Sequence, residues 1–412
     1  MAAACMLNFL LGASSAFPDD EPAPKDAAAD DTAKPPPKKP NGHGDLVSHA
    51  STEMSVYKDT DAVTVVTPTL AGRVENPLSE WSVGARWLVD VVSAASVDIV
   101  STASRRWREV RNEGDFDASA KFGDVGISGS GSVSSEPDYF AWAAGGNVSI
   151  DLAQKNVTLL GGYTYGRDTI GRSGTPFDVF SRIVETHTVN AALTVVVNKD
   201  TLLGFIGDLA FQEGDSSKPY RYIPMFTRSV AAKIPAGASI DLVNKERIFE
   251  RPLEQLPTSR DYGSLTVRLA KRFTTTTVRL SERLYRDTWG LSASTTDFKP
   301  IFDLGERVAF WPHARFHAQA PVAFWQRAYT AEFTPGGKWV LPRFRTGDRE
   351  LGPLTGVTGG MGFQFKIGPN DAPADLSLTV EGETIWTKYL DDLYITDRVS
   401  ALGVVGLEAV FE

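Results

Sequence analysis

The chain has 412 residues, and its 42 basic and 51 acidic side chains give a formal net charge of −9. This balance gives no support for nucleic-acid binding, which favours clustered lysine and arginine. The single cysteine, Cys5, lies in an apolar N-terminal stretch, so the rest of the chain forms neither a disulfide nor a thiolate metal site.

The first fifty residues differ in composition from the rest of the chain. Residues 1–17 are apolar and contain small residues near their end, which is typical of a secretory signal with Ala16 as the last residue removed. A positively charged start is missing, and the alternative is a disordered apolar N-terminus. Residues 18–50 are rich in Pro, Ala, Asp and Lys, which predicts a disordered linker because this composition buries too little apolar surface to fold.

Residues 51–412 are dominated by the alternation that is typical of β-strands. Between residues 357 and 367, for example, Val357, Met361 and Phe363 share one face, and Thr358 and Gln364 share the other. We find thirteen such segments and no helical periodicity. They lie near residues 61–74, 81–92, 135–152, 156–168, 184–197, 201–213, 262–272, 276–288, 290–304, 307–320, 354–367, 375–390 and 398–411.

The connections between these segments are either short or long. Short polar turns predict hairpins at residues 153–155, 198–200, 273–275 and 368–373. Long connections lie near residues 93–134, 169–183, 214–261 and 321–353. Bacterial outer-membrane barrels have this asymmetry, with short periplasmic turns and long external loops. No segment reaches the roughly 18 to 20 apolar residues of a membrane-spanning helix, so this chain crosses a bilayer only if it forms a closed barrel.

We therefore predict an all-β fold in which residues 51–412 form one antiparallel transmembrane β-barrel of about 14 strands, or about 12 to 16. Thirteen segments are one short of an even number, so either residues 45–57 supply another strand or one segment is divided wrongly. Aromatic residues near the predicted strand ends favour a membrane interface, and the alternative is packing in a soluble β core. These are Trp81, Trp87, Trp142, Tyr163, Tyr165, Trp289, Trp386 and Tyr389.

Five phrases occur together in a characteristic order. They are residues 55–61 (Ser-Val-Tyr-Lys-Asp-Thr-Asp), 90–96 (Asp-Val-Val-Ser-Ala-Ala-Ser), 135–139 (Ser-Glu-Pro-Asp-Tyr), 218–226 (Lys-Pro-Tyr-Arg-Tyr-Ile-Pro-Met-Phe) and 285–290 (Tyr-Arg-Asp-Thr-Trp-Gly). From roughly residue 50 to the end, the chain resembles a bacterial family catalogued as domain of unknown function 3570. The resemblance implies a barrel in the outer membrane of a Gram-negative bacterium, reached by export through the periplasm. It brings no reaction, substrate or binding residues.

If lipid contacts the apolar faces of the strands, the polar faces line a lumen. The candidates for lining it or binding a solute are Arg86, Asp208, Arg268, Arg279, Arg283, His313, Arg315, His317, Glu381 and Glu383. Three interpretations stay open: a structural network of ion pairs, a constriction that selects a solute, and metal or proton chemistry. Arg268 and Arg279 lie in one predicted hairpin and, with Arg283, form a cationic ladder suited to carboxylate or phosphate groups.

The sequence predicts no metal site, cofactor or catalytic residue. His313 and His317 lie about 13 Å apart on one face of a strand, so a single ion cannot bind both. No Gly-x-Ser-x-Gly elbow occurs in a strand-to-helix context. In the long loops, the candidates for recognition are Asp98, Asp215, Lys218, Arg221 and Tyr222. The alternative is that these loops fold into the mouth of the barrel and close it.

The predicted function is a channel or a binding protein for a small solute, with a polar lumen of mixed charge. A first alternative is a plugged barrel that serves as a structural or assembly platform for envelope partners. An outer-membrane enzyme is a further alternative, which we do not predict. The expected partners are outer-membrane lipid, the barrel-assembly machinery and a small solute, without nucleic acid.

Overall fold

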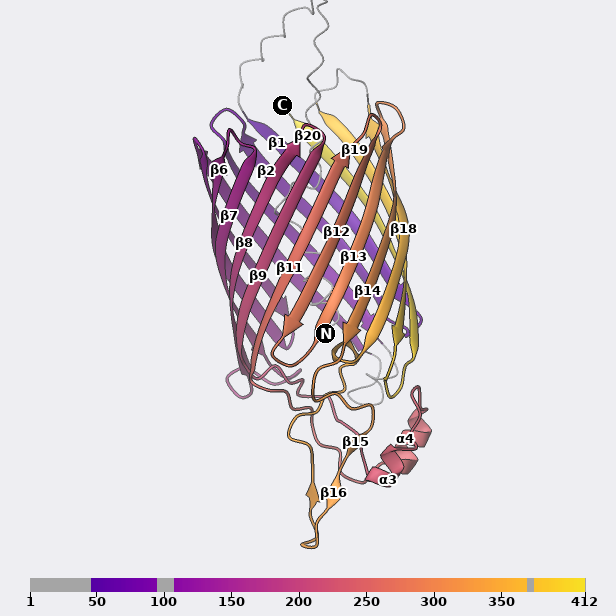
Figure 1. Cartoon of the computed structure of the whole chain (residues 1–412). Helices are drawn as coiled ribbons and strands as arrows, with labels where there is room; N and C mark the ends of the chain where they lie inside the picture. The colour runs from indigo at the N-terminus through magenta and orange to yellow at the C-terminus, as the bar shows by residue number, and fades with distance from the viewer. Residues whose placement is uncertain (1–45, 95–106, 369–373, 412) are drawn as a thin grey trace, which may run out of the picture.

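The computed structural model describes residues 46–94, 107–368 and 374–411, and these form one closed antiparallel β-barrel of sixteen strands (Figure 1). Each strand pairs with its neighbour in the chain order, and pairing of the first strand with the last, as at Ala50 with Ala409, closes the barrel. The strands are β1 (Val47–Asp59), β2 (Thr64–Asn76), β3 (Trp81–Ala94), β4 (Trp107–Phe122), β5 (Val125–Glu136), β6 (Tyr139–Leu152), β7 (Val157–Ile170), β8 (Arg182–Asn198), β9 (Thr201–Gly214), β11 (Ser259–Arg272), β12 (Thr276–Asp287), β13 (Ser292–Asp303), β14 (Val308–Ala320), β18 (Leu354–Ile367), β19 (Asp375–Tyr389) and β20 (Asp397–Phe411).

The alternation in the sequence places apolar side chains outside the barrel and polar ones inside. On β6, Trp142, Val148 and Ile150 are exposed on the outer face, while Asn147 and Ser149 alternate with them on the inner face. The register carries this division from strand to strand, because residues that are paired across a ladder point to the same face. The chain is therefore an outer-membrane-like barrel with an apolar outer surface.

The barrel has sixteen strands instead of about 14, which puts it at the upper end of the predicted range of about 12 to 16. The missing strands are β1, which we considered only as residues 45–57, and β4 and β5, which lie in the predicted connection 93–134. β4 carries charged residues on its inner face, and β5 is a run of glycine and serine with few large outward side chains. Small or polar residues interrupt the large apolar ones on their outward faces, which weakens the alternation.

The two rims of the barrel differ as the turn lengths predict. At one rim the strands are joined by short turns, and β1 begins and β20 ends there (Figure 1). At the other rim the long connections 215–258 and 321–353 emerge, together with 171–181 and 390–396. β1 begins at Val47, slightly before the predicted boundary at residue 51. The predicted secretory signal and residues 18–45 of the predicted linker lie outside the described residues.

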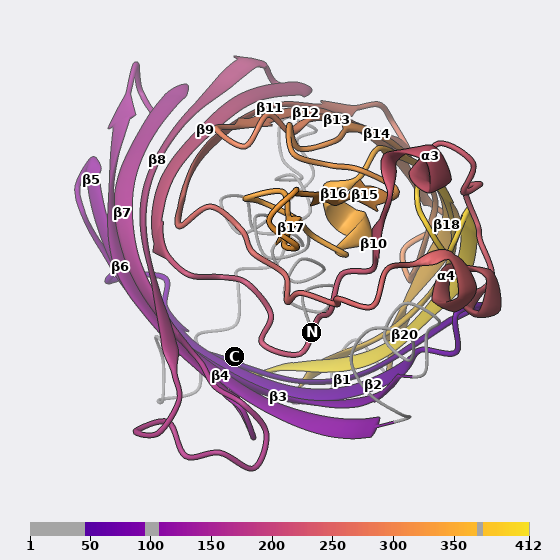
Figure 2. The same cartoon turned by 90° about the horizontal axis from the view of Figure 1, so that it is seen from below.

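The long connections 215–258 and 321–353 and the turn 390–396 pack together beyond the barrel, and we call them the cap. Viewed along the barrel axis, parts of the cap lie across the mouth (Figure 2). The cap contains short elements and its own small apolar cores, one around Phe226 and Val243 and another around Met225 and Tyr329. Its elements are β10 (Met225–Phe226), α3 (Arg228–Ala231), α4 (Ile240–Glu246), β15 (Tyr329–Thr330), β16 (Glu332–Phe333), β17 (Trp339–Val340) and η2 (Arg349–Leu351). No described helix has the length and hydrophobicity needed to cross a membrane.

Several predicted interface aromatics do lie on the outer wall. Trp142 and Tyr165 contact each other edge to face, with ring centroids 5.4 Å apart, near the rim that carries the cap. Trp289 and Tyr389 differ from the prediction, because they are only 6% and 2% exposed and pack under the cap instead of facing outward. Trp289 follows the cap-side end of β12 and Tyr389 is the last residue of β19, and at such strand ends sequence alone does not separate a membrane interface from a covered loop.

A carboxylate lies in the middle of the apolar outer wall on β12. Glu282 lies midway along β12, on the same face as the exposed Leu280 and Leu284. The hydroxyls of Ser294 and Thr296 on β13 donate hydrogen bonds to its two oxygens at 2.6 and 2.5 Å. These two donors offset part of the cost of placing a polar group on this face.

Candidate functional site

All ten predicted lumen residues lie on the inner face of the barrel. On β12, for example, Arg279 and Arg283 alternate with Leu280 and Leu284, which are exposed on the outer face. The others lie on β3, β9, β11, β14 and β19 and share the inner face through the register of the ladders. Whether these residues bind a solute stays a prediction.

Four basic residues on β11, β12 and β13 form a continuous inner patch, which we call the basic wall. Arg268 pairs with Ser281, which places it diagonally between Arg279 and Arg283 on the adjacent strand. Lys299 on β13 lies directly opposite Arg279, and its Nζ is 4.8 Å from the ring centroid of Trp311. Lys299 is a member of this patch that sequence reasoning missed.

Arg279 and Arg283, the two arginines of β12 that face the lumen, are not neutralised by any acidic side chain in the described part of the chain. Among the residues that the structure describes, neither Arg279 nor Arg283 has an ion pair with a carboxylate. Asp297, the acidic residue opposite Ser281 on β13, is already engaged by Arg315, whose Nε donates to it at 2.6 Å. A planar guanidinium group donates in a geometry that matches carboxylate and phosphate oxygens. The wall therefore presents cationic donors to the lumen.

On β3 and β4, opposite charges on the inner face are paired. Arg111 on β4 is 4% exposed, and its Nη2 lies 2.5 Å from Oδ2 of Asp90 on β3. Further along the same pair of strands, Nη2 of Arg86 on β3 lies 2.7 Å from Oδ2 of Asp115 on β4. Asp208 on β9 accepts a hydrogen bond of 2.9 Å from the hydroxyl of Ser264. The pairs on β3 and β4 fit the predicted structural network of ion pairs, whereas Asp208 is bonded to a neutral hydroxyl.

A third group of inner residues centres on His313, which is 9% exposed. Its Nε2 lies 3.0 Å from Oδ2 of Asp297, and its Nδ1 contacts Oε1 of Glu383. His317, four residues further along the same face, contacts instead the hydroxyl of Thr295, with its Nδ1 2.8 Å from Oγ1. The two histidines thus belong to separate polar groups, and sequence reasoning did not identify Asp297 as a partner of His313.

The predicted recognition residues of the loop 215–258 are engaged within the cap. Nη1 of Arg221 lies 3.1 Å from Glu254 and 3.1 Å from Asp348, so this arginine joins the two long connections. Asp215 pairs with Arg182 at 3.1 Å, and the backbone N–H of Lys218 donates to Glu254 at 2.9 Å. Tyr222 is 42% exposed, with the guanidinium of Arg251 5.6 Å from its ring centroid. Asp98 lies outside the described residues.

Ion pairing and burial adjust the titration of the cap. Burial opposes ionisation of Asp348, but Arg221 and the backbone N–H of Glu350 outweigh it and hold the pKa of that carboxyl below its usual range. Tyr220 donates a hydrogen bond of 2.8 Å to Asp138 in the β5–β6 turn, and burial, reinforced by Asp138, raises the pKa of Tyr220 to about 12. These contacts favour the alternative in which the loops close the mouth.

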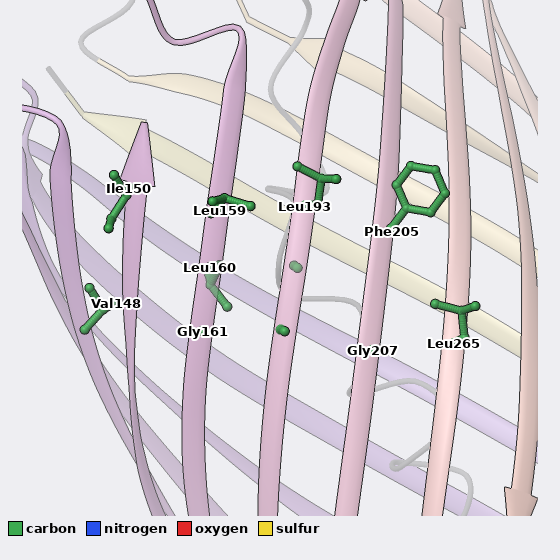
Figure 3. Close-up of a pocket in the computed structure, with 11 residues that line it drawn as sticks. Val148, Ile150, Leu159, Leu160, Gly161, Leu193, Phe205, Gly207 and Leu265 are labelled. Carbon is green, nitrogen blue, oxygen red and sulfur yellow. The ribbon is translucent and has the colours of Figure 1, made fainter. Parts of the chain in front are cut away.

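A shallow apolar hollow lies on the outer wall, spread over β6 to β9 and β11 (Figure 3). Its floor contains Gly161 and Gly207, and the larger Leu159, Leu193 and Phe205 stand around them. Its lining offers no charged or nucleophilic group. The hollow therefore does not compete with the lumen as a polar binding site.

Comparison with protein families gives one match over most of the barrel. The family model described as "Protein of unknown function (DUF3570)" matches residues 103–378. No curated protein sequence matches the chain significantly.

Solved structures with similar barrels share little sequence identity with this chain. The siderophore receptor PirA from Acinetobacter baumannii is 13% identical, with a TM-score of 0.41, and the alignment covers 83% of this chain and 53% of that receptor, so the chain spans about half its length. The CymD monoaromatic hydrocarbon channel is 8% identical, with a TM-score of 0.38 and coverage of 89% and 88%. A bacterial polysaccharide outer membrane secretin is 10% identical, with a TM-score of 0.41 and coverage of 90% and 99%.

Proposed function

The chain belongs to the DUF3570 family of proteins of unknown function, so we propose its role from the barrel itself. We propose that it is an outer-membrane channel or binding protein for a small solute that carries carboxylate or phosphate groups. The observation that carries this proposal is the basic wall, in which Arg279 and Arg283 face the lumen without an acidic partner among the described residues. Such a role needs the barrel in the outer membrane, with lipid against its outer wall and the barrel-assembly machinery as the partner that inserts it.

The size of the barrel supports passage or binding of a solute. Side chains fill the interior of an eight-stranded barrel, whereas porins of 16 to 18 strands leave an aqueous channel. The inner face of this sixteen-stranded barrel carries charged residues of both signs, which are costly in a dry interior. Water in the lumen solvates these groups and gives a solute access to them.

The charge distribution favours anions over cations along one side of the lumen. On β3 and β4 the arginines are neutralised by adjacent carboxylates, as with Arg111 and Asp90. On β12 they are not, so the local potential is positive there. A positive wall in a confined channel raises the local concentration of anions.

The test is ion preference in planar bilayers. The purified barrel is expected to give discrete conductance steps, and the reversal potential in a KCl gradient should show a preference for chloride. Replacing both Arg279 and Arg283 with Gln removes two positive charges from the lumen, so the ratio of chloride to potassium permeability should fall at least twofold. The matched control is Arg286→Gln, on the same strand but exposed on the outer face, which should leave the ratio unchanged. An unchanged ratio in the double variant contradicts the proposal.

A second candidate is a plugged barrel that serves as a platform for envelope partners, and the compact cap is the observation that favours it. The cap has buried apolar cores and a buried ion-pair group around Arg221, which a freely opening lid does not need. In this role the wild-type barrel gives no conductance in planar bilayers. That result would reject the channel and leave the platform.

A further inference from the structure

His313 and Glu383 meet across an intervening strand because that strand has a glycine between them. In the register, His313 on β14 pairs with Gly360 on β18, and Gly360 pairs with Glu383 on β19. A Cβ atom at Gly360 would lie 2.7 Å from Cγ of Glu383, which is closer than real Cβ contacts. Glycine at residue 360 thus leaves the space through which the carboxylate reaches the imidazole.

Glu381 completes a group of three potential ligands. One ligand atom from each of His313, Glu381 and Glu383 lies within 4.8 Å of the other two. Two ligands of a tetrahedral zinc ion, each about 2.1 Å from the metal, lie about 3.4 Å apart. Side-chain shifts of up to about 1 Å therefore bring the three atoms around a common ion.

Asp297 occupies the place of an outer partner for such a site. Its Oδ2 lies 3.0 Å from Nε2 of His313, and Nε of Arg315 donates to the same carboxylate at 2.6 Å. Histidines that bind metals commonly donate their other ring N–H to a carboxylate, which fixes the tautomer and the ring orientation. With the proton on Nε2, the lone pair of Nδ1 points toward Glu383.

The charge of this group also favours a cation. This group holds three carboxylates, those of Asp297, Glu381 and Glu383, together with the imidazole of His313 and the guanidinium of Arg315, which contacts Asp297. When the imidazole is neutral, as a metal ligand must be, negative charges outnumber positive ones by two in this immediate group. The side chains of His313 and Glu383 are only 8% and 13% exposed, so solvent screens this imbalance weakly.

We propose that His313, Glu381 and Glu383 bind one divalent transition-metal ion on the lumen wall, with Asp297 as the residue that orients the histidine. A donor set of one imidazole nitrogen and two carboxylates suits zinc and its first-row neighbours, and leaves a fourth position for water or a solute group. The site does not depend on the proposed transport role, since binding is measured on the isolated barrel. The competing state is a metal-free imidazolium held between Asp297 and Glu383.

The test is zinc binding by the purified, untagged full-length barrel in detergent. Isothermal titration calorimetry measures the affinity and the number of zinc ions bound per chain. We expect one zinc per chain, and cobalt substituted for zinc should give visible d–d absorption bands. His313→Gln should abolish binding, and Asp297→Asn should weaken it about 10- to 100-fold. His317→Gln is the matched control, because it lies on the same face of the same strand, and it should bind zinc as the wild type does.

Folding of each variant is checked by its heat-dependent migration on denaturing gels. If His313→Gln does not fold, Glu381→Gln replaces it, since it removes a ligand charge and preserves the shape of the side chain. If the wild type does not bind zinc one to one, the proposal is overturned, and His313 is then a metal-free imidazolium held between Asp297 and Glu383. Binding that survives the loss of His313 or Glu381, or that disappears in His317→Gln, also overturns it.

Discussion

Replacing Arg221 with methionine is expected to unfold the cap and leave the barrel intact. The guanidinium bridges Glu254, whose side chain is fully buried, and Asp348, at 3.1 Å each. Without it, Glu254 keeps a hydrogen bond from Thr346 at 2.7 Å but loses its counter-charge. Removing one partner of a buried ion pair costs about 3–5 kcal/mol. The apolar cores of the cap are small, so a loss of this size should exceed its local stability.

Limited proteolysis and amide hydrogen exchange measure this effect. In Arg221→Met, residues 215–258 and 321–353 should be cleaved and should exchange rapidly, while the barrel strands stay protected. Arg228→Met is the control: its pair with Glu332 at 2.7 Å has side chains 83% and 66% exposed, and such surface pairs contribute about 0–1 kcal/mol. A cap that stays protected in Arg221→Met would show that these ion pairs do not hold the two connections together.

A lysine in place of Val405 is expected to destabilise the barrel by about 2–4 kcal/mol in lipid. Val405 lies midway along β20 and is 50% exposed on the outer face, between the apolar positions Gly403 and Leu407. If this face contacts acyl chains, the ammonium group is placed far from both interfaces, where it can be solvated only by reaching toward a rim. The measurement is the free energy of unfolding in lipid vesicles, from a urea titration followed by tryptophan fluorescence.

The adjacent residue provides a matched control for this prediction. Val404 points to the inner face and pairs directly with Glu381 on β19. Val404→Lys therefore introduces the same charge one residue away, beside a carboxylate in a polar lumen, and should change the stability by less than about 1 kcal/mol. Equal destabilisation by both substitutions, or a larger effect at Val404, would mean that the inner and outer faces are assigned the wrong way round.

Local alternation predicted the barrel and the inward position of the lumen residues. Successive side chains of a strand point to opposite faces, so once one residue is known to face outward, the direction of every other residue in that strand follows. Arg268 and Arg279 were expected to adjoin because a short turn joins their strands, and the observed register places them diagonally on one face. β4 and β5 were missed for the opposite reason. Several outward positions hold small or polar residues, such as Asn112, Gly114, Gly129 and Gly131, so the alternation is interrupted, although pairing with neighbouring strands still holds both strands in the barrel.

Contacts between strands that are not sequence neighbours were beyond sequence reasoning. His313 and Glu383 meet only because β14, β18 and β19 pair in one particular register over Gly360. The link between Arg221 and Asp348 depends on the packing of two long connections, which carry no periodic pattern. Glu282 is the opposite case: alternation alone assigns it to the apolar face, and only the structure supplies its hydroxyl partners on β13.

The central claim is that the apolar face of each strand contacts lipid and the polar face contacts water. It is tested most directly by cysteine labelling in reconstituted vesicles, with Cys5 replaced by serine and one new cysteine at either Leu280 or Ser281, neighbours on β12 that point to opposite faces. A small water-soluble maleimide should modify Ser281→Cys and spare Leu280→Cys, whereas a maleimide dissolved in the lipid should do the reverse. Modification of Leu280→Cys by the water-soluble reagent, with Ser281→Cys protected from it, would contradict the account.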